Sequence, residues 1–122
     1  MTQEKSILIV DDEKNLADLV KYQLSAHGYH VAVASNGQEA LEKLKAFKPD
    51  LIILDMNMPV MNGLEFYTRI ADGSGATECP VLVLTTRSEL EDSFRGIDIA
   101  GFLPKPFLVE DLIKEVDRIL EI

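Results

Sequence analysis

Acidic side chains follow two short apolar stretches of the sequence, and these acids are the residues best suited to chemistry. Asp11 and Asp12 come directly after residues 7–10, and Asp55 comes directly after residues 51–54. An unbroken apolar run of this length is typical of a strand that is buried on both faces of a parallel sheet. In open parallel sheets, ligands bind outside the carboxyl ends of the strands. The sequence therefore predicts that the three carboxylates lie together at one edge of a sheet.

Two further polar residues follow later apolar stretches. Thr85 comes after residues 80–84, and Lys105 comes after the short stretch 101–104. Neighbouring carboxylates repel one another unless a cation lies among them, and a site with few carboxylates and several waters suits Mg²⁺. A Lys supplies a compact positive charge, and a Thr hydroxyl can donate to a phosphoryl oxygen. Together these residues suit phosphoryl transfer onto an Asp that acts as the nucleophile.

The elements that must position these residues alternate between strands and helices. Apolar residues recur at helical spacing between the apolar stretches, and Asn36 with Glu39 forms a capping-box pattern at the start of one helix. Such alternation predicts an α/β fold, with a parallel sheet and helices on both of its faces. The predicted strands are residues 6–10, 31–34, 51–54, 80–84 and 101–104. In the predicted helices, the residues that we expect to face the core include Leu16, Leu19, Val20, Leu24, Ala40, Leu41, Leu44, Phe47, Phe66 and Ile70.

Length and composition restrict the class of protein. The 122 residues favour a single domain over residues 1–122, with no output domain. The net charge of −9 argues against nucleic-acid binding, which needs clustered Lys and Arg. No apolar run approaches the roughly 20 residues of a membrane span. The polar N-terminus has no signal-peptide pattern, and the single Cys79 suits a reducing compartment, so we expect a cytoplasmic protein. His27 and His30 are interpreted as surface residues.

Nearly end to end, the chain resembles the receiver domain of bacterial two-component response regulators. The resemblance is carried by Asp11-Asp12, Asp55, Met58-Pro59, Asn62-Gly63, Thr85 and Lys105-Pro106-Phe107. It implies a doubly wound, flavodoxin-like (βα)₅ fold, with a parallel sheet in the strand order 2-1-3-4-5. It also implies a phosphorylation-activated signalling switch, which catalyses only its own phosphorylation and dephosphorylation and is not an enzyme for other substrates.

The resemblance also implies a role for each acid. Asp55 accepts a phosphoryl group from a phosphohistidine. Asp12 and Asp55 bind Mg²⁺ directly, together with the backbone carbonyl of Asn57. Asp11 acts indirectly, through water and by positioning.

For the remaining site residues, the resemblance implies two functions: a relay that transmits the phosphorylated state to the surface, and control of the rate of self-dephosphorylation. Thr85 and Lys105 contact phosphoryl oxygens, and Phe102 is the switch aromatic that turns inward when Thr85 moves. The relay ends at the surface formed by the fourth helix, the fifth strand and the fifth helix. Asn57 and Arg87 occupy positions that tune the rate of self-dephosphorylation. The segment between Thr85 and Lys105 is roughly two residues shorter than is usual for receivers.

The implied partners are a sensor histidine kinase or a histidine phosphotransfer protein, and a downstream protein target that the sequence does not identify. The resemblance implies no direct contact with nucleic acid or membrane, and a monomer or a phosphorylation-dependent dimer.

Three alternatives stay open. A phosphatase that forms an aspartyl phosphate would need an acid where the chain has Asn57, and a flavodoxin-like cofactor binder would need a Ser/Thr/Gly-rich loop where it has Asp11-Asp12-Glu13. The third alternative is a degenerate receiver that binds partners without phosphorylation.

Overall fold

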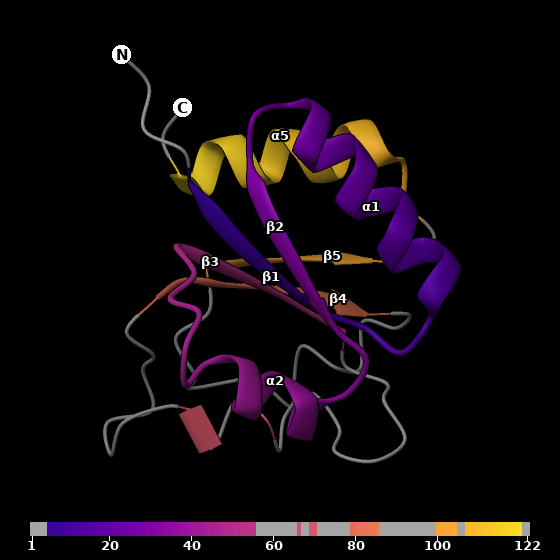
Figure 1. The fold of residues 1–122 in the computed structure, drawn as a ribbon. Coiled ribbons are helices and arrows are strands. Elements are labelled where there is room, and N and C mark those ends of the chain that lie inside the picture. The colour runs from indigo at the N-terminus through magenta and orange to yellow at the C-terminus, as the bar shows by residue number, and fades with distance from the viewer. Residues whose placement is uncertain are drawn as a thin grey trace.

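A single parallel sheet organises the protein. The computed structural model describes residues 5–55, 66, 69–70, 79–85, 100–104 and 107–120. Within these ranges, five strands are hydrogen-bonded in the order β2-β1-β3-β4-β5 (Figure 1). The strands are β1 (Ser6–Val10), β2 (His30–Ala34), β3 (Leu51–Asp55), β4 (Val81–Thr85) and β5 (Gly101–Pro104). All four neighbouring pairs are parallel, so the predicted fold class and strand order are confirmed.

The position of each strand in the sheet explains its sequence. All five residues of β3 are buried, as expected for a central strand that is covered on both faces. The outer strands are less buried, and β2 begins at the exposed His30, one residue before the predicted start. Successive side chains of a strand point to opposite faces, so the central strands supply two separate cores. Leu8 and Ile52 belong to one core, whereas Ile7 and Ile53 belong to the other.

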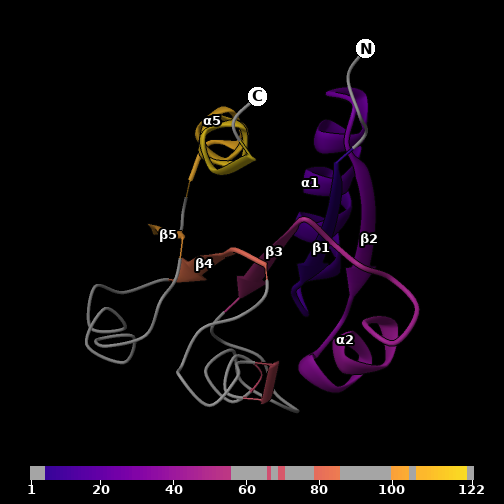
Figure 2. The ribbon, with the colours of Figure 1, turned by 90° about the vertical axis from the view of Figure 1, so that its left-hand side faces the viewer.

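Helices cover both faces of the sheet. Helices α1 (Lys14–Ala26) and α5 (Val109–Leu120) lie on one face, and α2 (Gly37–Lys43) lies on the other (Figures 1 and 2). Ala17, Val20 and Leu24 of α1 and Leu112 and Val116 of α5 pack in the core that these two helices share with the sheet. Ala40 and Phe66 are buried in the core on the α2 side, with Leu41, Leu44, Phe47 and Ile70 partly buried against it.

One predicted core residue of α1 is wrong. Leu19 is 46% exposed. The buried stripe of the helix runs through Ala17, Val20 and Leu24. Successive helical residues are rotated by roughly 100°, which places Leu19 to one side of this stripe. Leu16 is partly buried against the core, so the prediction holds for it in part.

The predicted N-cap of α2 at Asn36 is confirmed, but Glu39 bonds the N–H of Ser35 and not that of Asn36 as in a capping box. The N–H of Glu39 donates to Oδ1 of Asn36 at 2.8 Å, and Oε1 of Glu39 accepts from the N–H of Ser35 at 3.0 Å. These bonds satisfy donors that a helix N-terminus otherwise leaves without partners. They also fix the point at which the chain leaves β2.

Among the helices of the described ranges, none is both long enough and apolar enough to cross a membrane. Residues 86–99, which contain the predicted helix between Thr85 and residue 100, lie outside the described residues. The shortening of the segment between Thr85 and Lys105 therefore stays a prediction.

Candidate functional site

Three carboxylates meet at the carboxyl edge of the sheet. One oxygen atom from each of Asp11, Asp12 and Asp55 lies within 4.8 Å of the corresponding atoms of the other two. The register of the strands explains this convergence, because Val10 of β1 pairs with Leu54 of β3. The next residue of each chain segment is then an acid, so the two acids leave the sheet side by side.

Asp11 is held in place from two directions. Its N–H donates to the carbonyl oxygen of Ala34 at 3.0 Å, which ties it to the end of β2. Its Oδ1 accepts a hydrogen bond from the N–H of Glu13 at 2.9 Å, in the manner of an Asx turn. Sequence reasoning missed these two main-chain contacts, although Asp side chains commonly accept from the backbone N–H two residues further on. The contacts fix the carboxylate before any ligand binds.

The three acids differ in their access to solvent. Asp11 and Asp55 are each 2% exposed, whereas Asp12 lies at the surface. Asp12 and Glu13 come before the first turn of α1, which itself contains no acid. Asp55 belongs to β3 and not to α1, so stabilisation of a helix N-terminus does not by itself explain the three-carboxylate cluster. The cluster contains two buried acids and one that solvent reaches.

This arrangement favours a hard cation. Two unit charges 4.8 Å apart repel by about 1 kcal/mol in water and by about 3.5 kcal/mol at an effective dielectric constant of 20. A divalent cation among the oxygens attracts all three carboxylates, and these attractions outweigh the repulsion between them. Oxygen donors with carboxylate charge suit Mg²⁺, which retains several of its waters. The residues present therefore fit a magnesium site.

The other predicted site residues are placed less completely. Thr85 is the last residue of β4 and pairs with Pro104 of β5, so its backbone lies at the same edge of the sheet as Asp55. Lys105 directly follows β5 in the sequence but lies outside the described residues, as do Asn57 and Arg87. The roles of these residues stay predictions.

Phe102 lies on the edge strand β5 and is 41% exposed. It pairs with Val83 of β4. Its role as a switch stays a prediction.

Comparison with known proteins identifies the family. Residues 7–117 match the model of the response regulator receiver domain. Response regulator MprA of Mycolicibacterium vanbaalenii is 35% identical over 116 residues, and that of Mycobacterium tuberculosis is 36% identical over the same length. Each alignment covers 93% of this chain, but 49% and 50% of the respective relatives. The chain thus spans about half the length of the curated relatives that it matches.

Solved structures agree with this assignment. Chemotaxis response regulator CheY4 of Vibrio cholerae has a TM-score of 0.86 and 36% identity, over 96% of this chain and 99% of that one. Response regulator protein TrrA of Thermotoga maritima, solved in complex with Mg²⁺ and beryllofluoride, has a TM-score of 0.80 and 34% identity, over 94% of this chain and 98% of that one. By sequence and by fold, the chain belongs to the receiver domain family of two-component response regulators.

Proposed function

We propose that this chain is a phosphorylation-activated switch, in which Asp55 accepts a phosphoryl group from a phosphohistidine. The donor is a sensor histidine kinase or a histidine phosphotransfer protein, and the reaction takes place in the cytoplasm. The observation that carries the proposal is the convergence of Asp11, Asp12 and Asp55 within 4.8 Å at the carboxyl edge of the sheet.

Asp55 is the best candidate for the nucleophile. It ends the central strand β3, whose five residues are all buried, and it pairs with Leu84 of β4, which holds its main chain in the sheet. A fixed carboxylate favours in-line attack on a phosphorus atom, because less freedom is lost on reaching the transition state. Asp12, which solvent reaches, is placed to bind Mg²⁺ together with Asp55 and the predicted carbonyl of Asn57.

The main obstacle to the reaction is electrostatic. An attacking carboxylate must approach a phosphoryl group that is itself negative, and two further carboxylates stand nearby. Bound Mg²⁺ would supply the positive charge that offsets this repulsion. The ammonium group of Lys105 is proposed to pair with a phosphoryl oxygen and to add to this effect. Asp11, held by its two main-chain contacts, would position the other acids and act on Mg²⁺ indirectly, through water.

The effect of phosphorylation is proposed to pass along the sheet edge from β3 to β4 and β5. The aspartyl phosphate adds negative charge beside the end of β4, and the Thr85 hydroxyl then bonds a phosphoryl oxygen. Phe102 responds by turning inward, which changes the surface that β5 and α5 present. Asn57 and Arg87 tune the lifetime of the phosphate. The complex of the Thermotoga maritima protein with Mg²⁺ and beryllofluoride, a mimic of a phosphoryl group, supports this chemistry for the present chain.

Intact-mass measurement after treatment with acetyl phosphate tests the proposal. The wild-type protein should gain one phosphoryl group when Mg²⁺ is present and none when EDTA replaces it. Asp55→Asn should gain none. Asp18→Asn is the matched control, because Asp18 is an exposed acid on α1 outside the cluster, and it should behave like the wild type.

Two results would reject the assignment. If Asp55→Asn is labelled at the wild-type rate, the nucleophile lies elsewhere. If the wild type neither gains mass nor binds beryllofluoride with Mg²⁺, the chain is a receiver that works without phosphorylation. Release of many equivalents of phosphate from an added phosphate ester would instead identify an enzyme for external substrates.

A further inference from the structure

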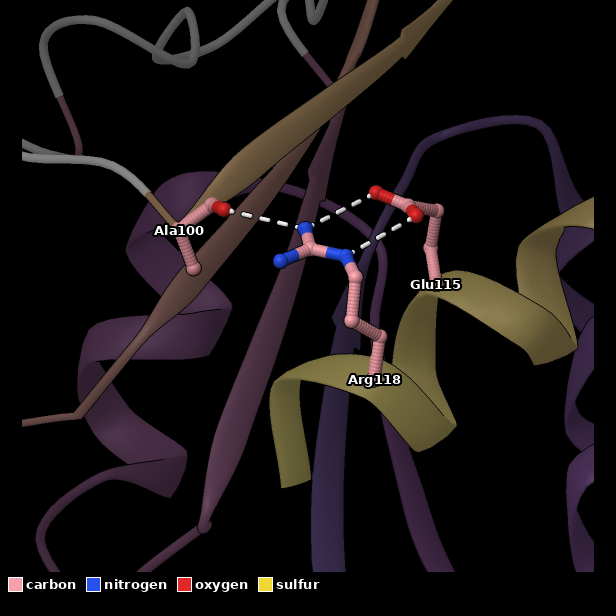
Figure 3. Close-up of polar contacts among 3 residues, drawn as sticks. All are labelled: Ala100, Glu115 and Arg118. Atoms are coloured by element: carbon pink, nitrogen blue, oxygen red, sulfur yellow. Dashed lines mark hydrogen bonds and ion pairs between the residues drawn. The ribbon is translucent and has the colours of Figure 1, made fainter. Parts of the chain in front are cut away.

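Two charged side chains of α5 join this helix to the start of β5. The guanidinium group of Arg118 donates from Nε to Oε2 of Glu115 at 3.1 Å, and from Nη2 to Oε1 of the same carboxylate at 3.0 Å. Nη2 also donates to the carbonyl oxygen of Ala100 at 3.3 Å (Figure 3). The guanidinium group therefore lies between its own helix and the main chain that enters β5.

The main chain at Ala100 is held by two different elements. Its N–H donates to the carbonyl oxygen of Val81 of β4 at 2.9 Å, whereas its carbonyl oxygen accepts from α5. Ala100 directly precedes Gly101, the first residue of β5. Within the described ranges, β5 is an outer strand of the sheet and pairs with β4 alone. The contact with Arg118 is thus a second hold on the start of an edge strand.

The glycine at the start of β5 leaves room for this contact. A Cβ added to Gly101 would lie 3.1 Å from Nη2 of Arg118 and 3.4 Å from Oε1 of Glu115. The first of these distances is shorter than ordinary van der Waals contact, so the added atom would displace the guanidinium group. The same Cβ would lie 3.6 Å from Leu82, the partner of Gly101 in β4, which is an ordinary contact. The space at Gly101 is therefore limited by the charged pair of α5 more than by the sheet.

This pair differs from an ordinary pair on the surface of a helix. Glu42 and Lys45 also lie three positions apart and are 3.2 Å apart, with side chains that are 69% and 72% exposed. Exposed pairs of that kind contribute little to stability. The Glu115 side chain is only 30% exposed, and the hydrogen bond from Arg118 lowers the pKa of its carboxyl group, so it stays ionised. What sets Arg118 apart is its third hydrogen bond, which leaves the helix and reaches the main chain before β5.

The preceding residue of α5 contacts a different neighbour. Asp117 accepts at Oδ1 a hydrogen bond from the hydroxyl of Tyr29, which belongs to the turn between α1 and β2. Gly28 of this turn has φ +100°, a conformation that residues with a Cβ rarely adopt. Successive residues of a helix are rotated by roughly 100°, so adjacent positions can reach different elements. The C-terminal part of α5 is therefore held both to the α1–β2 turn and to the start of β5.

We propose that Arg118, oriented by Glu115, is a strap that makes the start of β5 and the last turns of α5 open and close as one unit. An Arg suits this role, because its planar group can bond a carboxylate with two donors and still donate to a carbonyl. The bidentate pair also fixes the plane of the guanidinium group, so less freedom is lost when it contacts Ala100. The strap belongs to the folded chain itself and does not depend on the proposed phosphorylation of Asp55.

Hydrogen exchange of the backbone amides, measured by NMR, tests the strap. Arg118→Met keeps an aliphatic stem but removes the guanidinium group. It should lower the protection of the β5 amides and of the last turn of α5 by similar factors, roughly two- to fivefold, as for a partly exposed charged contact. Lys114→Met is the matched control, because it removes a positive charge from an exposed position one turn earlier on α5. It should leave the protection of β5 at the wild-type level.

A second substitution tests the room at Gly101. Gly101→Ala should lower the protection of β5 about as much as Arg118→Met does, because the added Cβ displaces the guanidinium group. In the Arg118→Met background it should cause little further loss, since the two changes remove the same contact. The proposal is overturned if Arg118→Met leaves β5 at the wild-type protection, or if Lys114→Met loosens β5 equally. Full additivity of the two changes would also overturn it, because the glycine and the guanidinium group would then act on β5 independently.

Discussion

Replacing Asp55 by Asn should stabilise the fold in the absence of divalent cations, although it removes the proposed phosphorylation site. One Asp55 oxygen lies within 4.8 Å of an oxygen of Asp11 and of Asp12. The repulsion from Asp11, which is as deeply buried as Asp55, lies toward the upper end of the range of about 1–3.5 kcal/mol, and that from the exposed Asp12 toward the lower end. Loss of the hydrogen bonds that a carboxylate accepts offsets part of this relief, by about 1–3 kcal/mol.

The expected net gain in the free energy of unfolding is therefore about 1.5–3.5 kcal/mol. For a domain of this size, that gain corresponds to a rise in melting temperature of roughly 5–15 °C. Thermal unfolding in EDTA, followed by circular dichroism, measures it. Saturating Mg²⁺ should raise the melting temperature of the wild type, because the ion binds the native state alone, and it should raise that of Asp55→Asn much less. Asp18→Asn makes the same change of charge outside the cluster and should stay within about 0.5 kcal/mol of the wild type.

The reasoning is refuted if Asp55→Asn melts below the wild type in EDTA while Asp18→Asn does not. That result would mean that the hydrogen bonds of the Asp55 carboxylate outweigh the repulsion of its neighbours. Equal stabilisation of the wild type and Asp55→Asn by Mg²⁺ would be a separate contradiction, because it would place the cation away from the cluster.

Three further substitutions test the turn, the cap and the relay. Gly28→Ala should lower the free energy of unfolding by about 1–2 kcal/mol through the backbone alone, because no atom lies within 4 Å of the added Cβ but φ is +100°. Urea denaturation measures this loss, and an unchanged midpoint would contradict it. Asn36→Ala should lower the free energy of unfolding by about 0.5–2 kcal/mol through loss of the hydrogen bond from the Glu39 N–H. Asn36→Asp should retain most of the wild-type stability in the same urea titration. Lys105→Ala should still take up some phosphate, but phosphorylation should no longer change partner binding; an unaltered response would rule out its role in the relay.

The fold could be predicted from the sequence because burial leaves a clear record in the central strands. β1 and β3 read as unbroken apolar runs, since both of their faces are covered. The edge strand β2 was predicted one residue short, because His30 faces solvent and looks like part of a turn. Leu19 recurs at helical spacing with Leu16, and this periodicity does not distinguish it from the neighbouring Val20, which is the residue that is buried.

The acidic site could be found for a related reason. Each of its residues comes at the end of an apolar run, so a one-dimensional pattern, combined with parallel topology, brings them to one edge. The contact between Tyr29 and Asp117 has no such pattern. Tyr29 and Asp117 are 88 positions apart, and neither follows a strand. A contact between side chains of a turn and of the last helix depends on how that helix packs on the sheet, which residue spacing does not encode.

The two ends of α5 therefore differ in the contacts that hold them. Its C-terminal end is fixed on two sides, by Asp117 to the α1–β2 turn and by Arg118 to the carbonyl of Ala100 just before β5. Its N-terminal end at Val109 comes shortly after Lys105, the residue proposed to contact the phosphoryl group. A displacement of Lys105 would then reach α5 at its N-terminal end, opposite the end that carries these two contacts.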